Sequence, residues 1–259
     1  MGERTRYEPG TFCWVGLATS DPVAAKAFYT SLFGWQAENL PGGEAGTYTA
    51  LRHRGKDVAI LYLQTRQARA AAAPPHWTSY ISVDDAGATA TRAGERGGAA
   101  VFRGPFDVSD AGRVAAIRDP TGAIVSLWQP RARIGAGLVN DLGALCWNEL
   151  ATTDVERAKS FFGELLGWEY ETDDGGYTTV KNAGRSNGGM RRQTEAERAI
   201  PPNWLPYFTV ESADEATRKS EQLGGRGVVA TTAASKGRFA VIADPQGASF
   251  AVFQGETDP

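Results

Sequence analysis

The sequence predicts an α+β protein made of four βαβββ units, in which one strand and one helix precede three further strands. The first observation is that residues 14–38 recur as residues 147–171 at a constant offset (147 − 14 = 133) without a gap. The second is that the motif Asp-Pro-x-Gly occurs at 119–122 and again at 244–247. Repeats of this kind indicate duplicated supersecondary units.

Each copy of the longer repeat begins with a short apolar segment, 14–19 in the first copy, which is typical of a strand buried on at least one face. Asp21 and Pro22 then fit the N-cap and the first position of a helix. Apolar residues follow at i, i+3, i+4 and i+7, which predicts one buried helix face. They are Ala25, Phe28, Tyr29 and Leu32 in the first copy, and Ala158, Phe161, Phe162 and Leu165 in the second. Gly34 and Gly167 suit the left-handed residue that ends a helix.

The second unit of each half repeats the strand–helix pattern with a different sequence. PPHWTSYISV at 74–83 matches PPNWLPYFTV at 201–210. A helix is expected from a cap at Asp84 or Asp85 to about Arg96, and a type I turn at the Asp-Pro-x-Gly motif. The other strands expected in the first half are 48–52, 58–63, 101–103, 113–118 and 123–129. The Ala- and Pro-rich connector at 66–75 is expected to be exposed.

The repeats divide the chain into two domains of two units each. Residues 1–130 form the N-terminal domain, with units 10–66 and 74–130. Residues 145–259 form the C-terminal domain, with units 145–193 and 201–255. The segment 131–144 is expected to be the linker between them. The sequence leaves open whether units pair within each half or exchange between halves.

Composition describes a globular protein, with 42% hydrophobic residues, 22% charged residues and a formal net charge of −3. A basic stripe for nucleic acid is lacking, and no apolar run approaches the ~20 residues of a membrane span. The start, MGERTRYEPG, lacks the apolar core of a signal peptide, so a cytoplasmic location is expected.

Cys13 and Cys146 occupy equivalent repeat positions, which favours two free thiols over a disulfide.

These residues resemble the vicinal oxygen chelate superfamily, which includes glyoxalases, extradiol dioxygenases, fosfomycin-resistance enzymes and bleomycin-binding proteins. The helix-plus-stop pattern D…A…FY…L.GW and the DP.G turn carry the resemblance, which spans nearly the whole chain. The chain is most similar to tandem glyoxalase-like proteins of actinobacteria, several of them tied to antibiotic pathways or self-resistance. The resemblance implies paired units whose sheets curl into half-barrel clefts, one cleft per pair.

The resemblance also implies where metal ligands would stand, and this chain departs from it there. Metal-using relatives place a His on the first strand of each unit, seven residues before the helix-cap Asp, and a carboxylate after the DP.G turn. The corresponding residues here are Trp14, Trp147, Thr78, Leu205, Ser126 and Ala251. Divalent metals need about three suitable side-chain donors, and the only histidines are His53 and His76. We therefore expect no metal and no other cofactor.

Strand alternation places aromatic and small residues on the cleft side of each sheet. The candidate ligand-binding residues are Trp14, Thr78, Tyr80, Ser126, Trp128, Trp147, Glu149, Met190, Leu205, Tyr207 and Phe253. Aromatic side chains bury about 150–250 Å² each, which suits a small aromatic or polyketide-like ligand. The alternative interpretation is that Trp14 and Trp147 only fill a cleft that has lost its metal. Trp35 and Trp168, next to the helix ends, are expected to be packing anchors.

Glu149 and Tyr207 are the candidate catalytic pair, because Glu149 would be the one carboxylate of a mostly apolar cleft and such groups serve as general acids or bases. The alternative is that Glu149 pairs with Arg191 or reaches solvent. Tyr80 and Tyr207 could donate to a ligand carbonyl or only close the sheet.

The function predicted from these residues is metal-independent binding of a hydrophobic or aromatic small molecule, for antibiotic sequestration or as an accessory in specialised metabolism, by a monomer or loose homodimer. The main alternative is a metal-free tailoring enzyme, such as a hydroxylase-like protein, cyclase or isomerase acting on a polyketide-like substrate, so whether the protein is an enzyme stays open. A metal-dependent glyoxalase or dioxygenase ranks lower, and an interaction protein with filled clefts is a fourth possibility.

Overall fold

The computed structural model describes residues 2–42 and 46–257, with only the backbone described at 102–103. The strands of the first half are β1 (Phe12–Thr19), β2 (Gln36–Pro41), β3 (Thr47–His53), β4 (Lys56–Leu63), β5 (His76–Ser82), β6 (Ala99–Val108), β7 (Gly112–Arg118) and β8 (Ile124–Pro130). Those of the second half are β9 (Leu145–Thr152), β10 (Glu169–Thr172), β11 (Thr178–Asn182), β12 (Arg185–Arg192), β13 (Asn203–Thr209), β14 (Arg226–Ala234), β15 (Gly237–Ala243) and β16 (Ser249–Gly255). The helices are α1 (Pro22–Phe33), α2 (Arg66–Ala70), α3 (Ala86–Glu95), α4 (Val155–Leu166), η2 (Glu195–Glu197) and α5 (Ala213–Gln222).

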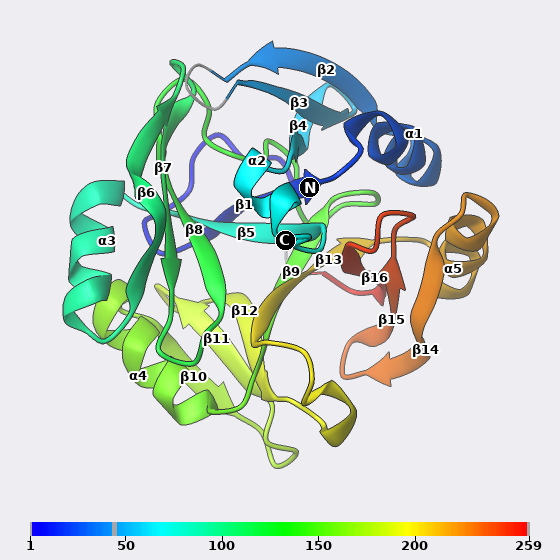
Figure 1. Ribbon diagram of the computed structural model, residues 1–259. Coiled ribbons are helices and arrows are strands. Elements are labelled where there is room, and N and C mark those ends of the chain that lie inside the picture. The colour runs from blue at the N-terminus through cyan, green and yellow to red at the C-terminus, as the bar shows by residue number, and fades with distance from the viewer. Residues whose placement is uncertain (1, 43–45, 258–259) are drawn as a thin grey trace.

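The strands form two eight-stranded sheets with matching topology (Figure 1). Their orders are β2-β3-β4-β1-β5-β8-β7-β6 and β10-β11-β12-β9-β13-β16-β15-β14. At the centre of the first sheet β1 and β5 are antiparallel, while β1 pairs with β4 and β5 with β8 in parallel. Units therefore pair within each half of the chain, and the predicted α+β fold of four βαβββ units is confirmed.

The four unit helices lie between the two sheets, so each sheet turns its helix-covered face toward the other. Helices α1 and α5 lie side by side at one end of the molecule, and α3 and α4 at the other (Figure 1). Near the centre the sheets touch directly, where Ser79 Oγ of β5 donates to Asn148 Oδ1 of β9 at 2.6 Å. The opposite face of each sheet consequently points outward.

Two tryptophans fasten the halves to each other reciprocally. Trp35 Nε1 donates to the carbonyl of Gly143 at 2.7 Å, and Trp168 Nε1 donates to the carbonyl of Gly10 at 2.7 Å. Both indoles are buried, and Gly10 and Gly143 are separated by the repeat offset. The prediction that both tryptophans are packing anchors is confirmed.

Tyr29 of α1 carries a second connection between the halves. Its hydroxyl donates to Asp244 Oδ2 at 3.0 Å and accepts from Trp77 Nε1 at 3.0 Å. Burial, and then the nearby Asp244 carboxylate, raise the pKa of the Tyr29 hydroxyl well above its ordinary value. Asp244 is the first residue of the second DP.G turn, so this motif also serves the contact between halves.

Local signals for the helix ends are confirmed. Asp21 accepts from the amides of Val23 and Ala24, and Gly34 and Gly167 end their helices at φ of 71° and 75°. Asp85, not Asp84, caps α3. The connector at 66–75 is largely exposed, as expected, and it contains the short helix α2. No residue range is predicted from the sequence for β2 or β10, and β6 extends well beyond the expected 101–103.

The segment 131–144 packs against the first sheet. The amide of Ala136 donates to the carbonyl of Cys13 at 2.8 Å, the amide of Gly137 donates to the carbonyl of Asp57 at 2.7 Å, and the side chain of Leu138 is buried. It thus fills the space where the starts of β1 and β4 diverge.

Both cysteines, Cys13 and Cys146, are free thiols, as the sequence predicted.

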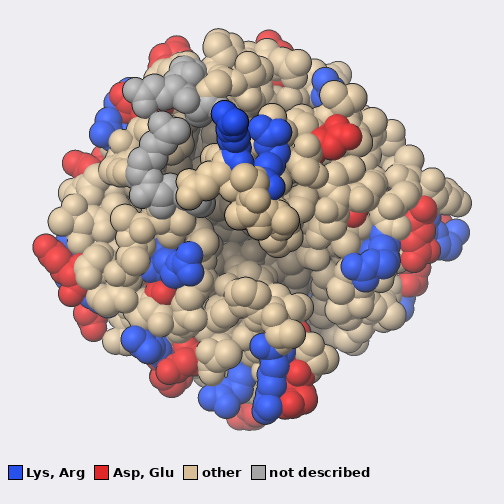
Figure 2. Space-filling view, viewed as in Figure 1, with Lys and Arg blue, Asp and Glu red and all other residues tan. Residues whose placement is uncertain are grey.

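The surface carries mixed charges. In the view of Figure 2, Lys and Arg alternate with Asp and Glu around the rim, and the hollow near the centre is walled by uncharged residues. Within the described ranges, no helix is long and apolar enough to cross a membrane.

Candidate functional site: two clefts of unequal openness

The outward face of the first sheet is filled by its own aromatic side chains. The candidate residues Trp14, Tyr80 and Trp128 are 1%, 6% and 2% exposed. The Trp14 ring lies 5.4 Å from that of Trp128 and 6.3 Å from that of Tyr80, and Thr78 and Ser126 are buried beside them. Tyr80 also packs over Gly16. The structure thus brings the five predicted residues of this cleft together, but leaves them little exposed surface.

Two contacts close the first cleft. Ser109 Oγ, at the tip of the β6–β7 hairpin, donates to the carbonyl of Pro41 at the end of β2 at 3.2 Å. Trp128 Nε1 donates to the carbonyl of Arg133 at 3.0 Å, which holds the segment 131–137 against the sheet. For the N-terminal half, the interpretation of the tryptophan as cleft filling therefore agrees with the structure.

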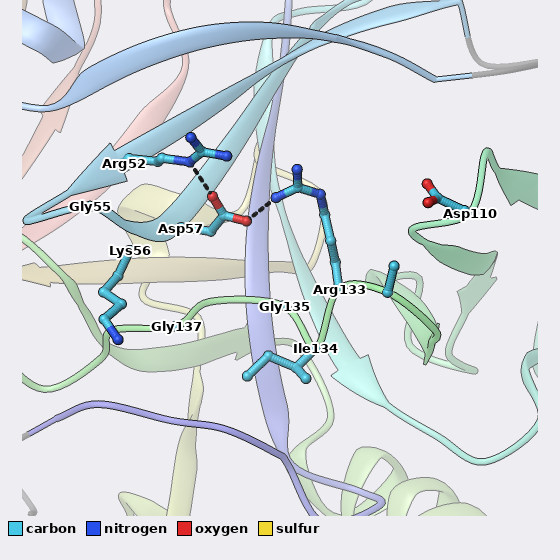
Figure 3. Close-up of a pocket in the computed structure, with 10 residues that line it drawn as sticks. Arg52, Gly55, Lys56, Asp57, Asp110, Arg133, Ile134, Gly135 and Gly137 are labelled. Carbon is cyan, nitrogen blue, oxygen red and sulfur yellow. Dashed lines mark hydrogen bonds and ion pairs between the residues drawn. The ribbon is translucent and has the colours of Figure 1, made fainter.

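A polar groove of about 450 Å³ remains between the β3–β4 hairpin and this segment (Figure 3). Asp57 lies at its centre, accepting from Arg52 Nε at 2.8 Å and from Arg133 Nη1. Both guanidinium groups are paired with this one carboxylate, so the charged side chains that line the groove neutralise one another. We therefore interpret these side chains as a structural ion-pair cluster.

The outward face of the second sheet is more open. Trp147, Leu205, Phe239 and Phe253 are all partly exposed, in contrast to their counterparts in the first half. The register pairs Leu205 with Glu149 and Tyr207 with Trp147, and Phe239 with Phe253. The Tyr207 ring lies 5.7 Å from the Phe239 ring. Four of the predicted residues, Trp147, Leu205, Tyr207 and Phe253, thus lie with Glu149 on one face of the sheet, which we call the C-terminal cleft. Trp147, Leu205 and Phe253 are partly exposed there, whereas Tyr207 and Glu149 are buried.

A polar cluster stands at one side of this C-terminal cleft. Arg191 Nε donates to Glu149 Oε1 at 2.8 Å, and Arg191 Nη1 and Nη2 donate to the two carboxylate oxygens of Glu197 at 2.7 and 2.6 Å. Tyr177 accepts a hydrogen bond from Trp147 Nε1 at 2.9 Å. The alternative expectation that Glu149 pairs with Arg191 is therefore the one the structure shows.

The two tyrosines of the cluster are held in their protonated form. Burial, and then the Glu149 carboxylate, raise the pKa of Tyr177 and of Tyr207 far above the ordinary value. Protonated hydroxyls can donate hydrogen bonds, whereas Glu149 accepts them. The cleft therefore combines an apolar wall with one guanidinium, one carboxylate and two tyrosine hydroxyls that hydrogen-bond to that carboxylate. Hydrogen bonding from Arg191 lowers the pKa of Glu197 to about 2.

The placement of Met190 in the cleft was wrong. Its side chain is fully buried in the core cluster that includes Leu150 and Phe162, on the helix side of the sheet. In the register Met190 pairs with Leu150 and its neighbour Gly189 pairs with Glu149, so strand alternation sends Met190 to the opposite face.

Sequence reasoning missed Tyr177 and Glu197. Tyr177 follows the turn TDDGG directly before β11, and it occupies the position that Tyr48 holds in the first half. A repeat alignment that allowed for the shorter β10–β11 turn would have found it. Glu197 lies in η2 of the β12–β13 connector, and the repeat alone gave no signal for it because the connectors of the two halves differ in sequence.

The residues in both clefts do not fit the divalent metal that the fold family implies. Trp14, Thr78 and Ser126 in one cleft, and Trp147, Leu205 and Ala251 in the other, offer no imidazole or carboxylate. His53 lies beside Gly143 and His76 is exposed at the start of β5. In residues 2–42 and 46–257, no three His, Cys, Asp or Glu side chains are grouped so that they could hold an ion.

Solved structures share this fold. The Mn(II)-bound glyoxalase from Novosphingobium aromaticivorans aligns with a TM-score of 0.64 at 14% identity, covering 100% of this chain and 85% of that one. The 2,3-dioxygenase LapB from Pseudomonas sp. KL28 aligns with a TM-score of 0.63 at 13% identity, covering 100% and 95%. At these identities the likeness concerns the fold alone.

Sequence comparisons identify the family. Residues 11–127 match the Glyoxalase/Bleomycin resistance protein/Dioxygenase superfamily, and residues 146–253 match a Glyoxalase-like domain. The protein CFP32 of Mycobacterium tuberculosis, provisionally named a glyoxylase, is 40% identical over 98% of both chains. The anthracycline biosynthesis protein DauV of Streptomyces sp. (strain C5) is 32% identical over 96% of this chain and 95% of its own. The chain therefore belongs to the glyoxalase/bleomycin resistance protein/dioxygenase superfamily, with two glyoxalase-like halves in tandem.

Proposed function

We propose that the C-terminal cleft binds a hydrophobic, aromatic or polyketide-like small molecule without a metal ion, as a sequestering protein or as an accessory in specialised metabolism. The observation that carries this proposal is the difference between the clefts. Trp147 and Phe253 are partly exposed, whereas Trp14 and Trp128 at the same repeat positions are buried. A partly exposed aromatic wall beside a few fixed polar groups is the usual composition of a ligand site.

Two further observations support it. The six positions where metal-using relatives place ligands hold none here, so binding depends on ring contacts and hydrogen bonds. Two relatives of matching length, DauV and DnrV, are named for anthracycline biosynthesis, which concerns polycyclic aromatic compounds. We propose that the protein acts as a monomer or loose homodimer, since each half already contains a pair of units.

Tryptophan fluorescence tests this proposal. Titration with an anthraquinone should quench the emission at micromolar concentrations, because the ligand would stack near Trp147. Trp147→Phe should remove most of the quenching, whereas Trp14→Phe, the same change in the filled cleft, should leave the ligand-dependent quenching intact. Absence of quenching by any polycyclic aromatic of a panel, or loss of quenching in Trp14→Phe alone, would contradict the proposal.

A metal-free tailoring enzyme is the second candidate function, and the polar cluster favours it. Glu149 would take a proton from a bound substrate while Tyr177 or Tyr207 donates to a developing oxyanion. Glu149→Gln is then expected to reduce turnover of a polyketide-like substrate by about 100-fold or more, as loss of a general base does. Ligand binding, measured in parallel, should survive. Equal turnover in wild type and variant would exclude this role.

Elemental analysis separates both candidates from a metal-dependent enzyme. We expect purified protein to contain far less than one equivalent of Ni, Zn, Mn or Fe, because the clefts lack the donors. A stoichiometric ion that survives dialysis would overturn the metal-free proposal.

A further inference from the structure

The polar cluster of the C-terminal cleft carries an excess of negative charge. Two carboxylates, Glu149 and Glu197, pair with the single guanidinium of Arg191, so these three side chains carry a formal charge of −1. Arg191 directs both terminal nitrogens to Glu197 and gives Glu149 a single bond from Nε. Both tyrosines are protonated and contribute no charge. The hydroxyls of Tyr177 and Tyr207 also hydrogen-bond to Glu149, whose side chain is 10% exposed. Its guanidinium partner therefore neutralises this carboxylate only in part, and a ligand amine would reach it at its exposed edge.

Aromatic rings flank this carboxylate. The Tyr177 hydroxyl lies over Gly189, which is the neighbour of Glu149 in the β9–β12 register, and it accepts from Trp147 Nε1 at 2.9 Å. Tyr207 pairs with Trp147 across the β9–β13 register. Aromatic rings around a carboxylate in a partly desolvated cleft attract ammonium groups through both charge and the ring quadrupole. Neutral or anionic ligand groups gain neither interaction.

We propose that the ligand of the C-terminal cleft is an aromatic compound that carries a protonated amine, and that Glu149 receives this amine. The inference rests on the proposed function, because it specifies the ligand class of the same cleft. The first half supports the assignment by contrast, because Gly16 stands at the position of Glu149 and Tyr62 at that of Arg191. The filled cleft therefore lacks this charge arrangement.

A matched pair of ligands tests the inference. An anthraquinone with an aminoethyl side chain and its N-acetyl derivative share one ring system and differ in charge. Wild-type protein should bind the amine about tenfold more tightly than the acetamide, as expected for a partly desolvated cation–carboxylate and cation–π contact. Glu149→Gln should erase the preference while binding of the acetamide changes little, because Gln keeps the shape and an acceptor for Arg191.

Two further variants make the result specific. Glu197→Gln should also reduce the preference, because Arg191 is then free to neutralise Glu149 fully. Glu95→Gln, an equal charge change on the exposed surface of α3, should leave it unchanged. Equal binding of amine and acetamide by the wild type, or a preference that persists in Glu149→Gln, would overturn the inference but leave the proposed function standing. Failure of both ligands to bind would overturn both.

Discussion

Phe208→Ala is expected to lower the free energy of unfolding by about 3–5 kcal/mol, the range for removing a fully buried aromatic ring. Phe208 of β13 is 0% exposed. Its ring lies 5.3 Å from Phe33, 5.5 Å from Trp35 and 5.3 Å from Trp77, all of which belong to the first half of the chain. The cavity would open where the halves meet, and neighbouring rings held by α1 and β5 cannot easily collapse into it. Urea unfolding followed by circular dichroism measures the change.

Phe239→Ala provides the matched control. The same number of atoms is removed from the same sheet, but Phe239 lies on the outward face and is partly exposed. The expected loss of stability is about 1 kcal/mol, because less buried area is given up. This control should instead weaken ligand binding. If the two variants lost similar stability, the contact between the halves would not be part of the main core.

Arg191→Gln is expected to destabilise the protein by about 2 kcal/mol, below the 3–5 kcal/mol reported for fully buried pairs. The reduction reflects the 29% exposure of the Arg191 side chain. Without the guanidinium, Glu149 and Glu197 would face each other unpaired in the cleft. Thermal unfolding at neutral pH measures the effect. The double variant Arg191→Gln/Glu197→Gln should recover part of the loss, whereas a purely additive loss would show that only packing was removed.

The pH dependence of Arg191→Gln follows from the same ion pair. Arg191 lowers the folded pKa of Glu197 from 4.5 to about 2. A lowered carboxyl pKa stabilises the folded state above its unfolded value, and this contribution disappears as the pH falls from about 4.5 to about 2. The gap in stability between wild type and Arg191→Gln should therefore narrow below about pH 4. A gap that stays constant down to about pH 2 would contradict this account.

The duplicated motifs were sufficient to predict the architecture. Asp21, Gly34 and the DP.G turns specify local conformations through their own backbone preferences, so their roles could be read directly. The helix α2 and the full length of β6 were not predicted, because neither has a strong apolar period and both depend on their surroundings. The pairing of units within each half is a tertiary property that repeated sequence cannot encode.

The candidate site was predicted in part. Strand alternation correctly placed Trp147 and Tyr207 on the face of Glu149, but Met190 was assigned to the cleft by its chemical character against the alternation. The unequal exposure of the two clefts could not be predicted, since Trp14 and Trp147 occupy equivalent positions in the repeat and each follows a cysteine. The distant segment 131–137, which packs against β8 in the first sheet, accompanies this difference among the described residues.

Because the helices occupy the space between the sheets, the two outward faces lie on opposite sides of the protein. The packed core between the sheets is therefore separate from the outward faces, which are the faces that solvent molecules can contact. One face can thus be filled by its own side chains while the other stays partly exposed, without disturbing the helices and strands that both faces share. A ligand bound at the second sheet, as we propose, could not pass directly to the first sheet. We therefore expect one bound ligand per chain and no transfer between the two faces.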